Sequence, residues 1–203
     1  MNNVHTCVRR FQSLLSTEYE ITLGRKGIAV TLLLSFAKED CFHLMGLQYL
    51  EDLPNLKRNR AEVFDDIATQ NIAAETIEAS DFYQKIKERV HLLHDLESIL
   101  DSNETVFRYN EKQFPYSKIK ADYLLDNLHE ETRVFVFLFP RKDGTHFCRS
   151  FFPAGPADFT RNQQRWTLLK KVKRNLTTGT EQELYRNPHY KEVTGEIINQ
   201  TST

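Results

Sequence analysis

The stretch "RVFVFLFPRKDGTHFCRSFF", residues 133–152, decides the fold of this chain. Its first part, residues 133–139, is apolar at nearly every position, which predicts a central strand buried on both faces. Asp143 and Gly144 then form a turn, and the apolar run "HFCRSFF" leads back from it. An Asp-Gly turn between two apolar runs is a strong hairpin signal. We therefore predict a β-hairpin in the middle of a sheet.

Further strands are expected on both sides of this hairpin. "VFRY" and "IKADYLL" precede it, and "RWTLLKKVK" follows it with an alternating basic face. Near the N-terminus, the turn "GRKG" separates a short strand from the β-rich run "IAVTLLLSF". From Asn175 onward the chain is polar, and we expect this end to be loosely held.

Helices are predicted mainly in the first half. Val8, Phe11, Leu14 and Leu15 share one side of an opening helix, and Ser80 with Asp81 can cap a long helix that ends near Leu100. The predicted helices span about residues 4–19, 41–50, 61–79 and 80–100. Helices followed by strands indicate the α+β class, with N-terminal helices packed on a mostly antiparallel β-sheet.

We expect one α+β domain over residues 1–174. Its helical part covers about 1–104, its sheet part about 105–174, and a polar tail follows over 175–203. Of the 203 residues, 40% are hydrophobic, which suffices for a core.

Composition and motifs exclude several classes of protein. Three cysteines without a CxxC spacing fit a reducing cytoplasm better than a disulfide framework. No signal peptide is visible, and no apolar run approaches the ~20 residues of a membrane helix. Metal-ligand spacing is poor, so we expect no metal and no other cofactor. A phosphate-binding glycine loop and a nucleophile elbow are also missing, which argues against P-loop nucleotide hydrolysis.

The net charge of −1 conceals an uneven distribution. Residues 133–174 hold ten basic and two acidic side chains, a net charge of +8, so the rest of the chain carries −9. A basic block beside an acidic one can bind a polyanion. Charge alone leaves equally open a solvated basic surface that offsets acidic helices.

Two residues in the helical part carry possible chemistry. His43 stands among apolar residues in "CFHLMGL", and Gly46 leaves room beside the imidazole if both lie on one helix face. Arg89 falls within the apolar stripe of the long helix, where a cation needs a partner or an anionic ligand. A hydrogen-bonded core histidine and a salt bridge from Arg89 to an acidic helix remain the structural alternatives.

Such residues suffice for metal-free RNA cleavage. A base takes the 2′-hydroxyl proton, a cation stabilises the phosphorane, and an acid protonates the leaving 5′ oxygen. In the sheet part, Lys120, Ser150, Thr160 and Gln163 could contact phosphate or base. Lys118 and the other residues of this group could equally be ordinary surface residues.

Taken in order, the motifs resemble a known family. The motifs are "FHLMGL", the helix with Arg89, "KIKADYLL", "SFF" and "DFTRNQQRWTLLKKVK", and the likeness as a whole spans about residues 8–174. This arrangement is similar to that of phage- and prophage-encoded nucleases related to barnase, EndoU, colicin and RelE, specifically the fourth phage-type family. The resemblance implies a nuclease core of that type that cuts RNA without a metal, as a toxin or host-takeover factor in a bacterial cytoplasm.

The resemblance also implies a set of site residues. The expected catalytic residues are His43, Arg89, Lys120, Ser150, Thr160 and Gln163, and the expected substrate-binding residues are Arg149, Arg165, Lys170 and Lys171. Two positions depart from the family pattern. Phe159 stands where a tyrosine is expected, and Met45 stands where a small hydroxyl residue or leucine is expected.

Three functions follow from these observations. The first is a metal-independent endoribonuclease, which has RNA as substrate and an antitoxin or host protein as a further partner. The second is a phage factor on the same fold that binds RNA through its basic strand, or inhibits a host protein, without cutting. The third is a structural module with an acidic partner and with His43 and Arg89 in its core. No membrane partner is expected.

Overall fold

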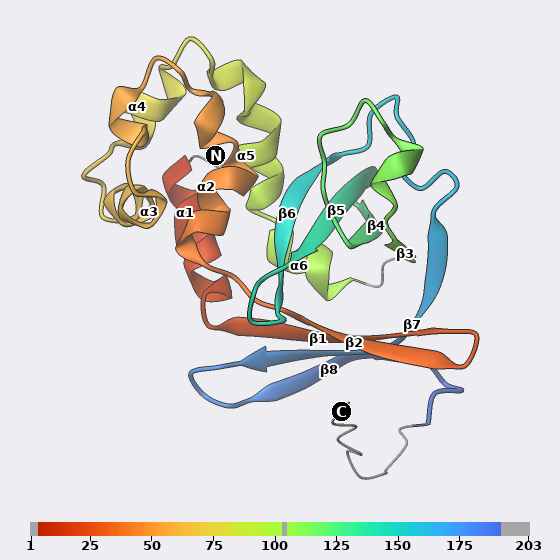
Figure 1. Cartoon of the computed structure of the whole chain (residues 1–203). Coiled ribbons are helices and arrows are strands. Elements are labelled where there is room, and N and C mark those ends of the chain that lie inside the picture. Colours follow the sequence, from red (N-terminus) through yellow and green to blue (C-terminus); the bar gives the residue numbers. More distant parts are fainter. Residues whose placement is uncertain (1–3, 103–104, 192–203) are drawn as a thin grey trace, which may run out of the picture.

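The computed structural model describes residues 4–102 and 105–191. Figure 1 shows the helices gathered beside the strands. Within the described ranges, the helices are α1 (Val4–Leu14), α2 (Lys38–Met45), α3 (Arg60–Ala68), α4 (Ala74–Glu78), α5 (Lys87–Leu93) and α6 (Leu96–Asp101). The strands are β1 (Thr17–Arg25), β2 (Ile28–Leu34), β3 (Thr105–Arg108), β4 (Tyr123–His129), β5 (Thr132–Pro140), β6 (His146–Pro153), β7 (Gln164–Asn175) and β8 (Glu181–Arg186). Short 3-10 helices span Leu47–Tyr49, Pro54–Leu56, Tyr83–Lys85 and Glu111–Gln113.

The strands close on themselves. Their order is β1-β2-β6-β5-β4-β3-β7, and β7 pairs again with β1, so that seven strands form a closed barrel and β8 is added along β7. The prediction of N-terminal helices packed on a mostly antiparallel sheet of the barnase/EndoU/RelE type is therefore wrong, because the strands close into a barrel. The physical reason is that β1 pairs antiparallel with both β2 and β7, which leaves neither of its edges open.

The pairings between neighbouring strands of the barrel differ greatly in length. β1 and β7 pair over eight register positions, from Thr17↔Asn175 to Gly24↔Thr167. β2 and β6, in contrast, pair in parallel at a single position, Leu34↔His146, next to a hydrogen bond from the Ser35 N–H to the His146 carbonyl. The junction between β2 and β6 is therefore the shortest ladder in the ring.

The central hairpin is confirmed. β5 lies between β4 and β6, and its residues 134–138 are all buried. Gly144 adopts a positive φ of 88° in the turn that connects β5 to β6. Both faces of β5 are covered because the helices pack on one and two loops pack on the other.

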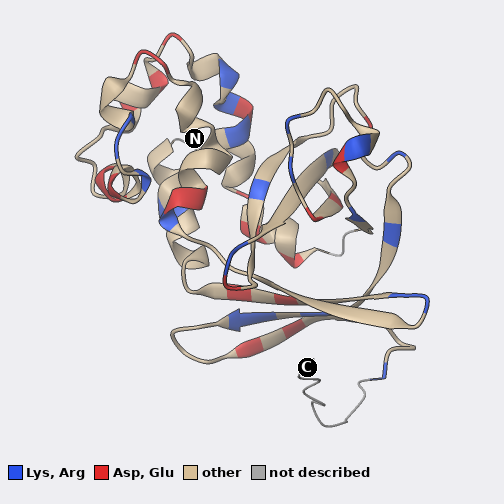
Figure 2. Cartoon of the chain, in the orientation of Figure 1, with Lys and Arg blue, Asp and Glu red and all other residues tan. Residues whose placement is uncertain are grey.

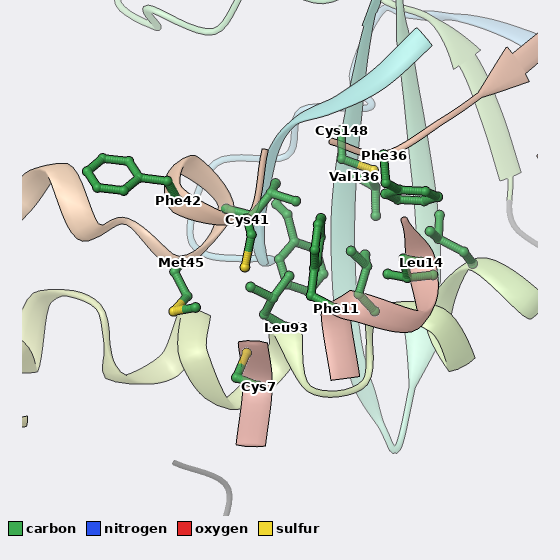
Figure 3. Packing of buried hydrophobic residues seen from close by; sticks show 14 of the residues in the cluster. Cys7, Phe11, Leu14, Phe36, Cys41, Phe42, Met45, Leu93, Val136 and Cys148 are labelled. Atoms are coloured by element: carbon green, nitrogen blue, oxygen red, sulfur yellow. The ribbon is translucent and has the colours of Figure 1, made fainter. Parts of the chain in front are cut away.

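Two hydrophobic clusters result. The larger one joins the helices to the barrel and includes Val134 and Val136 of β5. Figure 3 shows a part of it, in which Cys7, Phe11 and Leu14 of α1 lie close to Cys41, Met45 and Val136. The smaller cluster is aromatic and contains Phe135 and Phe137, with Phe152 and Phe159 packed against them.

The predicted long helix of residues 80–100 is broken. A 3-10 turn, α5 and α6 occupy this stretch, and the break between the two α-helices falls at His94 and Asp95. The Asp95 carboxylate lies 2.9 Å from His94 Nδ1 and 3.5 Å from His129 Nε2 in β4. The contact with His129 ties the junction between α5 and α6 to the barrel.

Strand β8 lies inside the stretch that we expected to be a polar tail. It pairs antiparallel with β7 from Lys170↔Arg186 to Arg174↔Glu181. Residues 192–203 of that stretch lie outside the described part of the chain. The domain boundaries stay a prediction.

Candidate active site

Helix α2 presents His43 to one side of the barrel. The helix begins after Ala37, whose N–H donates to the Asp40 carboxylate at 2.7 Å. It ends at Gly46, where a φ of +83° in the left-handed region allows the Gly46 N–H to donate to the His43 carbonyl at 3.1 Å. Cys41, Leu44 and Met45 are buried in the core. His43 is only half-buried because it faces a pocket instead.

Gly46 therefore terminates the helix and does not lie within it as expected. A Cβ at this position would come within 3.1 Å of Ile86 Cγ2 and 3.2 Å of Arg89 Cδ. The lack of a side chain at Gly46 makes room for Arg89 of α5.

A β-bulge shapes the opposite wall. In the pairing of β5 with β6, Phe137 faces Ser150 and Leu138 faces Cys148, so Arg149 is the extra residue. The bulge shifts the alternation of the strand by one position. As a result, the neighbouring residues Arg149 and Ser150 both line the pocket.

The pocket has a volume of about 460 Å³ and lies between the helices and β6. Its helical wall comes from α2, the 3-10 turn after it, the start of α3, and α5. Its other wall comes from β6 and from Lys118 and Ile119 in the loop before β4. Elements far apart in the sequence thus meet here (Figure 1).

Four cations converge on this pocket: Arg60, Arg89, Lys118 and Arg149. Within residues 4–102 and 105–191, none of the four forms an ion pair with a carboxylate. The expected alternative for Arg89, a salt bridge to an acidic helix, is therefore wrong. The positive charge of the pocket is available to an anionic ligand.

Aromatic rings support the three arginines. The Arg60 guanidinium carbon lies 5.7 Å from the centre of the Phe42 ring, and that of Arg89 lies 5.5 Å from the Tyr49 ring. Arg149 lies 5.6 Å from the Phe139 ring in the same way. A ring face attracts a guanidinium without neutralising its charge, so these contacts hold the arginines and leave their charge uncompensated.

Two groups in the pocket have shifted pKa values. Burial, together with the charges of Arg60 and Arg149, lowers the pKa of His43 below 6.5. The imidazole is therefore neutral near pH 7 and can accept a proton. Burial raises the pKa of Asp40, although its carboxylate forms an ion pair with Arg141. Asp40 thus adds little negative charge to the pocket, because Arg141 compensates it.

The structure brings together four of the residues singled out from the sequence. His43, Arg89, Arg149 and Ser150 all line the pocket. Lys118, which the sequence left as an ordinary surface lysine, lines it as well. Met45 is fully buried in the core, so its departure from the family pattern lies outside the pocket.

Three other expected catalytic residues lie elsewhere. Lys120 lines a neighbouring hollow of about 360 Å³ beside Tyr109 and Lys112. Thr160 Oγ1 accepts a hydrogen bond from Arg133 Nη2 at 3.1 Å.

Gln163 ties two loops together. Its Oε1 accepts from the Asn110 N–H at 2.7 Å, and its Nε2 donates to the Asn110 carbonyl at 3.2 Å. Thr160 and Gln163 therefore brace the loops that cover the aromatic cluster, and neither side chain lines the pocket.

The basic strand β7 is largely neutralised within the protein. Lys173 Nζ lies 2.8 Å from the Asp101 carboxylate, and Arg174 pairs with Glu18 at 2.9 Å and with Glu181 at 2.7 Å. Figure 2 shows basic and acidic segments side by side across β1, β7 and β8.

The expected substrate-binding residues of β7 differ in exposure. Arg165 is exposed, Lys170 is partly buried, and Lys171 is fully buried. Lys171 Nζ donates to the Leu100 carbonyl at 2.9 Å and also to the Ser102 carbonyl. Lys171 is therefore inaccessible to a ligand.

Sequence reasoning missed Arg60, Tyr49 and Gln48. Arg60 carried a usable signal, because it is the first residue of α3, directly after the N-cap Asn59. A cation at a helix N-terminus opposes the helix dipole, which marks it as a residue kept for another reason. Tyr49 and Gln48 carried no comparable signal.

The aromatic residue at position 159 has a packing role. The Phe159 ring lies 4.9 Å from Phe114 and 5.5 Å from Phe137, measured between ring centres. It also lies 5.7 Å from Phe152, which lines the pocket. Phe159 therefore supports a wall of the pocket from behind.

Two searches of the described residues bear on broader classes. No helix in residues 4–102 and 105–191 is long and apolar enough to cross a membrane. In the same ranges, no three His, Cys, Asp or Glu side chains gather in a way that could hold a metal ion.

Comparison with known proteins identifies the family. The family model described as phage-Barnase-EndoU-ColicinE5/D-RelE like nuclease 4 matches residues 3–187, which is most of the chain. Comparisons with curated proteins and with solved structures give no match. The resemblance inferred from the motifs is confirmed. The chain belongs to the phage-type nucleases related to barnase, EndoU, colicins E5 and D, and RelE, in the fourth of these families.

Proposed function

We propose that this protein is a metal-independent endoribonuclease that cleaves RNA by attack of a 2′-hydroxyl on the adjacent phosphate. One observation carries the proposal: a neutral imidazole and four cations without ion pairs share a single pocket. A base and a concentrated positive charge are what this reaction requires. Membership of a nuclease family supports the proposal from a second side.

In this mechanism His43 is the general base. Its imidazole takes the proton of the 2′-hydroxyl, and the 2′ oxygen then attacks phosphorus as the bond to the 5′ oxygen breaks. The lowered pKa of His43 favours the neutral form that this step needs. The product is a 2′,3′-cyclic phosphate and a free 5′-hydroxyl.

The cations act on the phosphate. Arg89 and Arg149 approach from opposite walls and stabilise the negative charge that develops on the phosphorane, while the Ser150 hydroxyl can donate to a phosphate oxygen. Among the four cations, Lys118 is the one that can release a proton to the leaving oxygen, because a guanidinium stays protonated. Lys120, Thr160 and Gln163 are left out of this active site because none of them lines the pocket.

A toxin or host-takeover role in a bacterial cytoplasm would follow from this activity. The phage origin implied by the family name supports that role. Its partners would then be RNA and an antitoxin or a host protein.

The test is cleavage of labelled RNA in excess EDTA by the wild type and by His43→Gln. We expect the wild type to cut and the variant to lose at least 100-fold in rate, as is typical for removal of a general base. His91→Gln is the matched control, because His91 is exposed on α5 outside the pocket. Melting temperatures verify that both variants fold.

The other outcomes are equally informative. Equal cleavage of a strand with 2′-deoxy nucleotides would contradict the mechanism, because no 2′-hydroxyl could attack. RNA binding without cleavage would indicate the non-catalytic phage factor, and neither binding nor cleavage would indicate a structural module.

A further inference from the structure

The charge of the pocket exceeds what one phosphate can balance. Arg60, Arg89, Lys118 and Arg149 contribute four positive charges, and Arg141 already compensates Asp40. A phosphodiester carries one negative charge, and the phosphorane formed during cleavage carries about two. Two cations therefore remain without a counter-charge even when the reaction is under way.

The four cations are also spread over separate elements. Arg60 begins α3, Arg89 lies on α5, Lys118 lies in the loop before β4, and Arg149 is the bulged residue of β6. Asp40 lines the pocket but pairs with Arg141, so none of the four cations has an ion-pair partner within the described residues. A ligand with several charges can therefore contact cations on several walls of the pocket at once.

The pocket offers places for bases as well. Tyr49, which is 42% exposed, lines it next to Arg89. Unpaired bases stack readily on such an exposed aromatic side chain. A volume of about 460 Å³ is that of a small-molecule site, so it can admit about one nucleotide with its flanking phosphates but not both backbones of a duplex.

We infer that the pocket binds at least two successive phosphates of one unpaired RNA strand, with the cleaved phosphate beside His43 and a neighbouring phosphate within reach of the same four cations. This inference rests on the proposed function, since it takes RNA as the ligand. It adds that cleavage requires a strand that is unpaired at the site and extends beyond the scissile phosphate. A dinucleoside monophosphate, which has a single phosphate, is therefore a poor ligand.

The experiment measures binding without cleavage. Fluorescently labelled 2′-O-methyl RNA, which cannot be cut, is titrated with the full chain at several salt concentrations. For single strands, the slope of log affinity against log salt is about −0.7 per neutralised phosphate. We expect a slope of about −1.4 or steeper. A dinucleoside monophosphate, with one phosphate, should compete at least about tenfold more weakly than a trinucleotide with three phosphates in total.

Single variants test whether the salt dependence of binding arises from the cations of the pocket. Arg60→Gln and Lys118→Gln should each make the slope shallower by about 0.7. Lys26→Gln is the control, because Lys26 is exposed in the turn between β1 and β2 and lies outside the pocket. Its slope should equal that of the wild type.

Three results would overturn the inference. These are a wild-type slope near −0.7, pocket variants that leave the slope unchanged, and a duplex of the same sequence that binds more tightly than the single strand. Displacement of the RNA by inorganic triphosphate at lower concentrations than by the trinucleotide would also overturn it, in favour of a compact polyphosphate.

The two proposals fail separately. Cleavage of ordinary RNA with a shallow salt slope would refute only the requirement for several phosphates. A steep, pocket-dependent slope without cleavage would refute only the proposed catalysis.

Discussion

The Arg89 side chain packs directly beside the position that a Cβ of Gly46 would occupy. The distance from that Cβ to Arg89 Cδ would be 3.2 Å. The same glycine ends α2 one turn after His43 with a φ of +83°. One residue without a side chain therefore places both the proposed base and one of the proposed cations.

Replacement of Gly46 by alanine should damage stability and activity together. The left-handed backbone alone costs about 1–2 kcal/mol with a Cβ, and crowding against Ile86 and Arg89 should add about 1–3 kcal/mol. The control is Gly27→Ala, because Gly27 has a φ of +81° and nothing within 4 Å of its Cβ position. Urea unfolding should show the smaller loss for Gly27→Ala, with unchanged cleavage. Equal losses for both variants would mean that the contact with Arg89 is unimportant.

The pH dependence of cleavage should report the state of His43. Because burial and the nearby arginines lower the pKa of His43 below 6.5, the imidazole becomes protonated only under more acidic conditions. We expect kcat/KM to rise with pH and then to level off, and the midpoint, the pH at which it is half-maximal, should lie below 6.5.

A variant tests the cause of that midpoint. Arg60→Gln removes one of the charges that lower the pKa of His43, so the midpoint should move to higher pH. The His91→Gln variant should keep the wild-type profile. A midpoint at or above 6.5 in the wild type, or no movement in Arg60→Gln, would rule out this role for the two residues.

The basic strand β7 should contribute little to RNA affinity. Arg165→Gln should bind 2′-O-methyl RNA within about twofold of the wild type, because Arg165 is exposed on β7 but lies outside the pocket. Arg149→Gln should weaken binding about tenfold, as expected for loss of a charge-assisted phosphate contact. Fluorescence anisotropy measures both. Comparable losses in the two variants would show that β7 forms the RNA interface.

Phe159 should matter for stability. Its ring packs against four phenylalanines of the smaller cluster, so Phe159→Ala should lower the free energy of unfolding by about 2–4 kcal/mol. Tyr116→Ala, at a fully exposed aromatic residue, should change it by less than about 0.5 kcal/mol. Phe159→Tyr should leave the cleavage rate within about threefold. A large gain in rate would instead give the missing hydroxyl a part in the chemistry.

The central hairpin was predictable from the sequence, but the break between α5 and α6, strand β8 and the closure of the strands into a ring were not. Two apolar runs and the Asp143-Gly144 turn between them specify the hairpin of β5 and β6, because those signals lie within a single short stretch. The pairing of β1 with β7 joins residues 17–24 to residues 167–175. Neither stretch alone indicates which strand it pairs with, so the sequence patterns predict two strands without predicting that they pair with each other.

Some residues of the candidate site were likewise predictable from the sequence, and others were not. His43 and Arg89 stand out in the sequence because a polar group on an apolar face needs a reason. The bulge at Arg149 could not be predicted, since it depends on how β6 pairs with β5. Ion pairing was equally hidden: Arg174 and Arg149 look alike in the sequence, yet Arg174 is paired and Arg149 faces the pocket.

The single pairing position between β2 and β6 bears on how the two walls of the pocket are held together. β2 continues directly into α2, which carries His43, while β6 carries Arg149 and Ser150. The two strands that position opposite walls of the pocket are joined by the Leu34↔His146 pairing and by the hydrogen bond from the Ser35 N–H to the His146 carbonyl. The Asp40–Arg141 ion pair also joins α2 to the turn between β5 and β6, so the two walls of the pocket are held together at two separate places.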